Sequence, residues 1–431
     1  MNRTAYTNAR LFDPANGLDE TGALLVEDGK IADLGASLFS GGVPQDMETV
    51  DCGGKLLTPG LIDMRVFTGE PGTEFRETLG SASQSAAAGG ITTIIVMPNT
   101  DPVIDDVALV DFIERRARDT AIVNVHPMAA LTRGCAGEQM TEIGLLKDAG
   151  AVAFTDGDKP LSDPLVMRRA LSYAHFFDAL IVQHAEDRDL AAGGVMNEGE
   201  LASRLGLTGR PSAAETIMIE RDLRLVELTG ARYHVAQVTC KASVDIIRRA
   251  KQNGLPVTCG VSAPHLTLNE NDVASYRSFM KLSPPLRHED DRLAVVEGVA
   301  DGTIDVIVSS HDPQDPETKR LPFAQAAYGA VGLETLLPAT LSLVHGGTLA
   351  LERAIEALTT SPASLLGLKS GHLTKGSPAD LTLIDMNVPW VLDPEKLKSK
   401  SKNTPYDERR LQGRAIRTIV GGKEVHVSGG K

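Results

Sequence analysis

The sequence predicts an α/β protein, built as a (β/α)8 TIM-type barrel with a small β-sandwich domain formed by both chain termini. First, eight short apolar runs alternate with helix-length segments between residues 57 and 370, the pattern of strands that are each followed by a crossover. Second, both ends of the chain alternate short apolar stretches with Gly, Asn and Asp turns, which favours hairpins. Third, 431 residues are enough for a large core and an accessory domain.

The predicted small domain combines residues 1–56 with residues 371–431, on either side of the predicted barrel at 57–370. In the first segment Asp28-Gly29 separates two apolar runs, which is a hairpin signal. Such a sheet needs a partner to bury its apolar face. The other end of the chain offers one, because residues 379–385 and 417–427 also read as strands.

The predicted barrel strands are named here by their residue ranges. They are 61–67, 91–97, 121–126, 151–154, 180–184, 232–238, 256–260 and 304–310. Helical patterns lie between them, at 77–88, 107–118, 165–176, 213–228 and 243–253. Because barrels of this type carry their catalytic groups at the C-terminal ends of the strands, those ends are the candidate site.

Composition excludes several classes of partner. A net charge of −14 and a pI near 5.2 argue against nucleic acid or an anionic membrane surface, since both reward clustered Lys and Arg. The apolar runs are far too short to span a bilayer. The four cysteines are scattered without a paired spacing, which fits a reducing compartment. We therefore expect a cytoplasmic protein.

The stretch at 57–72, LTPGLIDMRVFTGEPG, governs the functional interpretation. Its apolar run after Pro59-Gly60 predicts a buried parallel strand. Side chains alternate along a strand, so Asp63, Arg65 and Phe67 are expected on one face and Met64 and Val66 on the other.

This stretch resembles the first barrel strand of the cyclic amidohydrolases, most closely the class I dihydroorotases. In that family two zinc-binding His stand at the positions of Arg65 and Phe67, and an Arg that grips the substrate carboxylate stands at that of Gly69. Arg has no lone pair to give and carries a permanent positive charge, and Phe has no donor atom. The two positions are therefore predicted not to bind metal.

The resemblance extends to the other strand ends, where retained and lost positions alternate. Asp156 and His184 match ligand-type positions of the family, while Gln237 stands where a ligand His is expected. Ser310 replaces the general acid/base Asp, and a hydroxyl does not serve that role near neutral pH. Asp312, two residues further on, is the displaced candidate for the lost carboxylate.

The predicted pocket contains further positions that contact substrate in the family. Asn99 matches an Asn of the second strand end, although Pro-Asn-Thr is equally a good turn. Ser283 stands where an Asn is expected, and Gln314 where a His is expected. We also expect Arg65 to enter the space of the metal and to pair with Asp156.

Three functional hypotheses follow from these patterns. The first is a catalytically inactive dihydroorotase homologue, a scaffold subunit that assembles with aspartate carbamoyltransferase as a homo- or hetero-oligomer and needs no cofactor. The second is an active dihydroorotase, or another cyclic amidohydrolase, whose zinc is held by a rearranged set of Asp156, His184, His311 and Asp312. The third is a regulatory module that binds an anion through Asn99 and Arg65.

Overall fold

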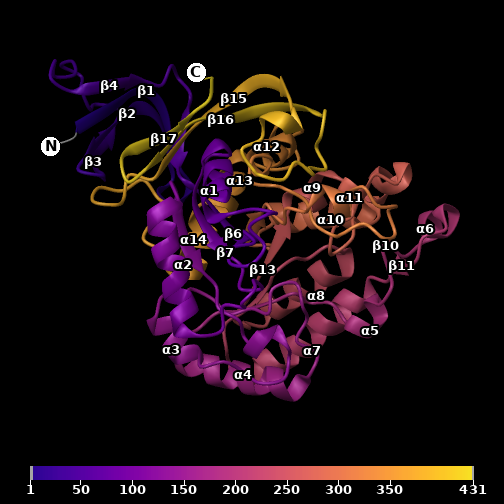
Figure 1. Ribbon diagram of the computed structural model, residues 1–431. Coiled ribbons are helices and arrows are strands. Elements are labelled where there is room, and N and C mark those ends of the chain that lie inside the picture. Colours follow the sequence, from indigo (N-terminus) through magenta and orange to yellow (C-terminus); the bar gives the residue numbers. More distant parts are fainter. Residues whose placement is uncertain (1–2, 430–431) are drawn as a thin grey trace.

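The computed structural model describes residues 3–429, which form a β/α barrel beside a small β domain (Figure 1). All pairs of neighbouring barrel strands are parallel. The barrel strands are β6 (Leu61–Val66), β7 (Ile91–Val96), β8 (Asn124–Pro127), β9 (Ile181–Gln183), β12 (Tyr233–Val235), β13 (Val257–Ser262) and β14 (Val306–Val308).

The fourth predicted strand is reduced to one residue, Phe154, which bridges Ala129 on one side and Ile181 on the other. A further parallel bridge from Val66 to His311 closes the ring between β14 and β6. The prediction of a (β/α)8 barrel is confirmed, with eight strand positions around a closed circuit.

Helices cover the outside of the barrel. The longer ones are α1 (Leu79–Ala88), α2 (Val107–Thr120), α4 (Pro164–Phe176), α7 (Ala213–Thr229), α8 (Lys241–Gln252), α10 (Glu289–Ala300), α12 (Leu336–His345) and α13 (Leu351–Leu358). The shorter ones are α3 (Ile143–Asp148), α5 (Arg188–Ala191), α6 (Glu200–Leu205), α9 (Ala263–Thr267), α11 (Pro316–Lys319) and α14 (Thr360–Leu366). Side-chain caps set several starts; Asp163, for example, accepts hydrogen bonds from two backbone N–H groups of α4.

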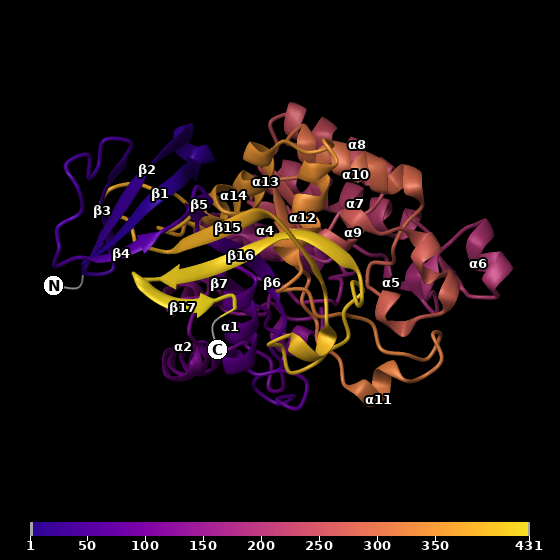
Figure 2. The same cartoon turned by 90° about the horizontal axis from the view of Figure 1, so that it is seen from above.

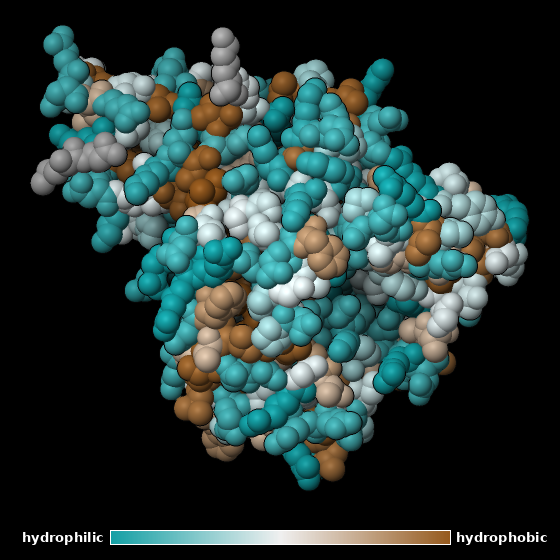
Figure 3. Space-filling model, in the orientation of Figure 1, coloured by the Kyte–Doolittle hydropathy of each residue, from teal (hydrophilic) through white to brown (hydrophobic). Residues whose placement is uncertain are grey.

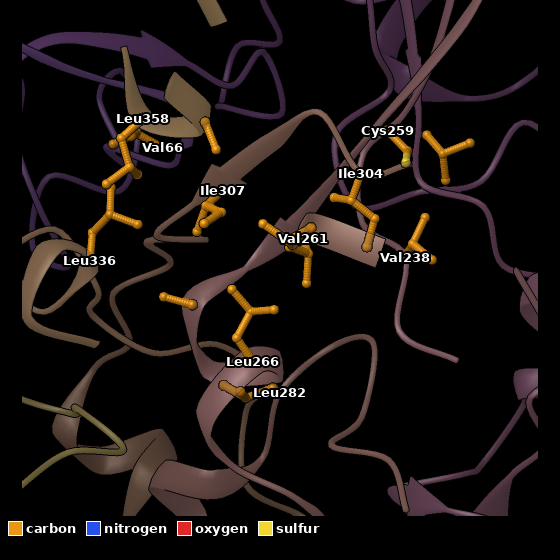
Figure 4. Packing of buried hydrophobic residues seen from close by; sticks show 14 of the residues in the cluster. Val66, Val238, Cys259, Val261, Leu266, Leu282, Ile304, Ile307, Leu336 and Leu358 are labelled. Carbon is orange, nitrogen blue, oxygen red and sulfur yellow. The ribbon is translucent and has the colours of Figure 1, made fainter. Parts of the chain in front are cut away.

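Two apolar clusters follow from the alternation of the strands. The outer cluster joins strand residues to the helices, and Figure 4 shows part of it, where Leu336 and Leu358 lie beside Val66. The inner cluster fills the barrel and includes Met64, Phe67 and Val308. The expectation that Met64 shares a face with Val66 is wrong, because the pairing of β6 shifts register between Asp63 and Val66.

The small domain is one eight-stranded sheet built from both ends of the chain. Its strands are β1 (Arg3–Asp13), β2 (Leu18–Glu27), β3 (Lys30–Gly35), β4 (Glu48–Asp51), β5 (Leu56–Pro59), β15 (Leu381–Val391), β16 (Arg410–Val420) and β17 (Lys423–Val427). The order is β17-β16-β15-β5-β1-β2-β3, with β4 paired to β1. A separate ribbon on the barrel pairs β10 (Met196–Asn197) with β11 (Gly209–Arg210).

The expected sandwich is a single sheet that curls over its larger apolar cluster. Residues of β3 and β16 share that cluster, and the backbone of Gly29, in the β2–β3 turn, lies against Gly421 in the β16–β17 turn. Figure 2 shows β15 and β16 extending from this sheet across the barrel helices, where β16 packs on α12. The predicted boundaries at 56 and 370 stay predictions; β5 spans the first of them.

The face seen in Figure 3 is mainly hydrophilic, with hydrophobic side chains gathered in small separate patches. Within the described residues, no helix is long and apolar enough to cross a membrane.

Candidate functional site

A cavity of about 590 Å³ opens at the C-terminal ends of the barrel strands. Eight positions singled out from the sequence line it: Arg65, Phe67, Asn99, Ser283, Ser310, His311, Asp312 and Gln314. Four others, Gly69, Asp156, His184 and Gln237, do not. The cavity is therefore the candidate site, but the retained ligand-type positions lie outside its lining.

Arg65, on β6, brings an unpaired guanidinium group to this cavity. Its backbone N–H donates to the Asp63 carboxylate at 3.2 Å, but among residues 3–429 its side chain has no hydrogen-bond acceptor. Burial lowers the pKa of Arg65, and the charges of Asp158, Asp312 and Asp63 oppose that shift. An Arg with a half-buried charge and no acceptor is costly to the fold, which makes it a functional candidate.

The expected pair between Arg65 and Asp156 is wrong. Asp156 Oδ1 accepts the backbone N–H of Thr132 at 2.8 Å, and its Oδ2 accepts the hydroxyl of the same residue at 2.5 Å. Burial raises the pKa of Asp156, and these two hydrogen bonds lower it. Local hydrogen bonds thus satisfy this carboxyl group, and it needs no distant counter-charge.

Asp312 is one of two carboxyl groups in the cavity lining, the other being Asp158. Asp312 Oδ1 accepts hydrogen bonds from Arg76 Nη2 at 2.7 Å and from Gln314 Nε2 at 2.9 Å. Burial raises the pKa of Asp312 to about 6, despite the nearby Arg76 charge. The Asp312 carboxyl group fits here because residue 329 is a glycine. A Cβ at Gly329 would lie 2.3 Å from Asp312 Oδ2.

The turn that carries Asp312 starts at Ser310, the residue that replaces the family's acid/base. Ser310 has φ of +52°, a left-handed conformation that non-glycine residues rarely adopt. Its neighbour Ser309 donates its backbone N–H to buried Asp63. This strained strand end is consistent with a functional role.

His184 and Gln237 are buried inside the barrel without strong partners. His184 Nε2 lies 3.6 Å from Glu186 Oε2, and that carboxylate is held by Arg210 Nη1 at 3.0 Å to both oxygens. Neither polar atom of the Gln237 amide has a hydrogen-bond partner among the described residues. A Gln amide offers zinc a weak, neutral ligand in place of an imidazole.

His311 lines the cavity but is engaged by the protein. Its Nδ1 accepts the backbone N–H of Gly332 at 3.2 Å, which leaves the proton on Nε2, 3.4 Å from Glu77 Oε2. Although burial opposes it, this contact with His311 lowers the pKa of Glu77. The imidazole therefore has no free lone pair for a metal.

The donor set does not fit zinc. In the part of the chain from residue 3 to residue 429, no three His, Cys, Asp or Glu side chains gather as a metal site. The rearranged set of Asp156, His184, His311 and Asp312 is dispersed, because Thr132, Glu186, Glu77 and Arg76 respectively engage its members. A structural or catalytic zinc site needs three or four protein ligands around one point.

Adding zinc is therefore expected to leave the thermal unfolding midpoint unchanged. A metal present at one hundred times its Kd would stabilise the fold by about 2.7 kcal/mol. The midpoint is measured after dialysis against a chelator, with and without added zinc, and the zinc content of the purified protein by elemental analysis. Stoichiometric bound zinc would contradict this expectation.

Two predicted contact positions are constrained by glycines. Asn99 donates its amide to Asp158 at 3.2 Å and packs against Gly157, where a Cβ would lie 2.6 Å from the Asn99 amide carbon. Gly69 has φ of +71°, and a Cβ there would approach the carbonyl oxygen of Thr73 to 2.8 Å. The loop therefore accommodates no side chain at Gly69.

Sequence reasoning missed several cavity residues, among them Arg76, Asp158, Lys159 and Tyr328. Asp158 and Lys159 follow Asp156 in the same turn at the end of the fourth strand. The expectation that functional groups lie at the C-terminal strand ends could therefore have identified them. Arg76 packs its guanidinium 4.5 Å from the ring centre of Phe67, a contact between segments that no sequence signal predicts. Tyr328 accepts a hydrogen bond from Arg210 at 3.0 Å.

Comparisons with known proteins agree along the whole chain. Residues 54–243 match the dihydro-orotase-like family and residues 327–426 the amidohydrolase family. The dihydroorotase of Wolbachia sp. subsp. Brugia malayi is 46% identical over 98% of this chain and 96% of its own length, and that of Ehrlichia canis is 44% identical over 98% and 95%. The L-hydantoinase (dihydropyrimidinase) of Arthrobacter aurescens superposes with a TM-score of 0.90 at 28% identity, covering 100% of this chain and 97% of its own.

These relatives contradict the interpretation of the chain as a catalytically inactive scaffold subunit. Proteins named dihydroorotase align with nearly all of it at 44–46% identity, which favours the alternative of an active enzyme. The inference of inactivity assumed that a chain without the family's metal ligands has no catalytic activity. The strand ends still bring a carboxyl group, Asp312, and a free cation, Arg65, to one cavity.

Proposed function

Because the chain belongs to the dihydroorotase family of amidohydrolases, we propose that it is a cyclic amidohydrolase that opens and closes the amide ring of a dihydroorotate-type substrate. The observation that carries the proposal is a carboxyl group of raised pKa, Asp312, that shares its cavity with the unpaired guanidinium of Arg65. One supplies a base and the other a positive charge for a developing oxyanion.

In ring opening, Asp312 accepts one proton from the attacking water as its oxygen bonds to the amide carbon. The acyl oxygen gains negative charge, which the N–H groups of Arg65 stabilise. When the carbon–nitrogen bond breaks, Asp312 returns its proton to the leaving nitrogen. The product is a carboxylate and a terminal ureido group, and the remaining proton of the water is released to solvent.

The proposal is tested by assaying the purified chain in both directions, with L-dihydroorotate and with its ring-opened product, N-carbamoyl-L-aspartate. We expect turnover that persists after exhaustive dialysis against a chelator. Absence of turnover in both directions by a monodisperse, cooperatively unfolding protein would refute the proposal. Turnover that is lost on chelation and restored by zinc would refute the roles given to Asp312 and Arg65.

The rate of ring opening is expected to depend on pH through Asp312. Its pKa of about 6 means that the carboxylate is present above that pH and is lost as the pH falls through it. Between pH 7 and pH 5, kcat/KM is expected to fall about tenfold. A profile that is flat over this range would contradict the assignment.

A second buried carboxyl group must be separated from this effect, because burial raises the pKa of Asp63 to about 6 as well. Asp63 lies behind the cavity and accepts backbone N–H groups of Arg65 and Ser309. In the D312N variant any pH dependence that survives belongs to Asp63 or to the fold. The difference between the two profiles therefore reports Asp312.

Association with aspartate carbamoyltransferase stays a separate proposal that only the sequence resemblance supports. It is tested by mixing the two purified proteins and measuring the mass of the species in solution. Co-elution at a defined ratio would support it, and independent elution at micromolar concentrations would refute it.

A further inference from the structure

We propose that the cavity binds small dicarboxylates, and so holds the ring-opened form of its substrate in preference to the cyclic amide, through the side chains of Arg65 and Lys159. The identity of the substrate rests on the proposed function. The preference for two carboxylates rests on the charges of the cavity itself.

The cavity has three basic side chains in its lining, Arg65, Arg76 and Lys159, and two acidic ones, Asp158 and Asp312. Arg76 is already used, because it donates to Asp312 at 2.7 Å and to the carbonyl oxygen of Pro313 at 2.8 Å. Among residues 3–429, neither Arg65 nor Lys159 donates a side-chain hydrogen bond to the protein. Two cations are therefore left for a ligand.

Of the two residues, Arg65 provides the stronger evidence that the cavity binds a ligand carboxylate. Buried Arg210, by contrast, donates side-chain hydrogen bonds to Glu186, Ser283 and Tyr328 at 3.0 Å. The Arg65 charge is only partly offset by Asp158 and Asp312, which act on it at a distance. A carboxylate ligand would accept two parallel hydrogen bonds from this guanidinium group. Such a bidentate, charge-assisted pair is among the strongest contacts that an Arg side chain makes.

Lys159 adds a second, more exposed charge at the rim. Among the described residues no ion pair joins it to its neighbour Asp158, whose carboxylate accepts the amide of Asn99 at 3.2 Å. Lys159 acts on buried Asp156 only at a distance, as a charge that lowers the pKa of that residue. A flexible ammonium group of this kind binds a ligand carboxylate as a point charge.

Ring opening changes the ligand in the way that these cations favour. The cyclic amide carries one carboxylate, whereas the ring-opened form carries two, because the amide carbonyl becomes a carboxylate. The new carboxylate arises at the carbon whose oxygen faces Arg65 in the proposed reaction. Each charge-assisted contact is worth about 1.5–3 kcal/mol, which corresponds to roughly a 10- to 100-fold difference in Kd.

The test uses succinate and succinamate, two non-reacting probes of the same size that differ by one carboxylate. Calorimetric titration of the full chain is expected to give a Kd for succinate at least about tenfold lower than for succinamate. In R65Q the affinity for succinate is expected to fall about 10- to 100-fold and the preference to disappear. R65K keeps the positive charge but loses the paired N–H groups of the guanidinium. Its Kd for succinate is expected to lie between those of the wild type and R65Q.

The matched control is R118Q, because Arg118 is exposed on α2 away from the cavity. R118Q is expected to bind both probes as the wild type does, and K159Q to weaken succinate a few-fold. Because the Arg65 side chain makes no hydrogen bond to residues 3–429, R65Q is expected to fold normally, and K159Q tests the same preference at an exposed position. Equal affinity for the two probes in the wild type, or an unchanged preference in R65Q, would overturn the proposal.

The outcomes for binding and for catalysis are separable. Arg65-dependent succinate binding by a chain that does not turn over dihydroorotate would support the dicarboxylate site and refute the proposed reaction. Turnover by a chain without any dicarboxylate preference would refute this inference and leave the reaction in place.

Discussion

Replacing Asp312 with Asn is expected to lower kcat/KM for ring opening by about 10²- to 10⁴-fold, the usual contribution of a positioned general base. The substitution keeps the shape of the side chain, and its amide oxygen can still accept the hydrogen bond of Arg76 at the position of Oδ1. The group that takes the proton from water is lost. The measurement is steady-state kinetics with dihydroorotate above pH 7, where the wild-type carboxylate is ionised.

The control for this variant is D148N, since Asp148 lies exposed at the end of α3, far from the cavity lining. Unfolding midpoints of D312N and D148N within the error of the wild type would show that the fold is intact. If D312N retains wild-type kcat/KM, Asp312 is not the base, and the proposed mechanism is wrong.

Replacing Arg287 with Met is expected to destabilise the chain by about 3–5 kcal/mol, because it leaves a buried carboxylate without its counter-charge. Arg287 and Glu215 are both 2% exposed, and Arg287 Nη2 lies 3.6 Å from Glu215 Oε2. Arg287 also donates to the hydroxyl of Thr239 at 3.0 Å and to the carbonyl oxygen of Arg210 at 2.9 Å. One side chain thus joins β11, α7 and the loop that follows β12.

The loss is measured as the shift in urea unfolding of R287M against R118M, whose parent residue is exposed. The double variant E215Q/R287M removes both charges, so it is expected to recover part of the loss. An R287M variant as stable as R118M would show that Glu215 is satisfied without Arg287, through its hydrogen bonds from Thr239.

The segments that hold Arg210, Glu215 and Arg287 belong to a buried network, whose geometry depends on charge pairing inside the protein. The side chains that line the cavity have fewer partners within the protein; that of Arg65, for example, makes no hydrogen bond to the described residues. Residues that satisfy one another within the fold are constrained by stability, whereas cavity residues are constrained by the ligand.

The sequence by itself predicted the barrel and the joining of the two chain ends, and it shows that Arg65 and Phe67 offer no lone pair to a metal. These features depend on local periodicity and on the chemistry of single side chains, both of which are readable along the chain. It did not determine whether the chain is an enzyme, because the substitutions at single positions say nothing of what else reaches the same space.

Only the tertiary structure decided the partners of the site residues. In the structure Asp156 is hydrogen-bonded to Thr132, and His311 lies against Glu77. Arg76, on one loop, pairs with Asp312 on another. The structure also left Arg65 without an acceptor among the residues it describes. Such pairings join positions up to 236 residues apart, and their geometry depends on how the whole barrel closes.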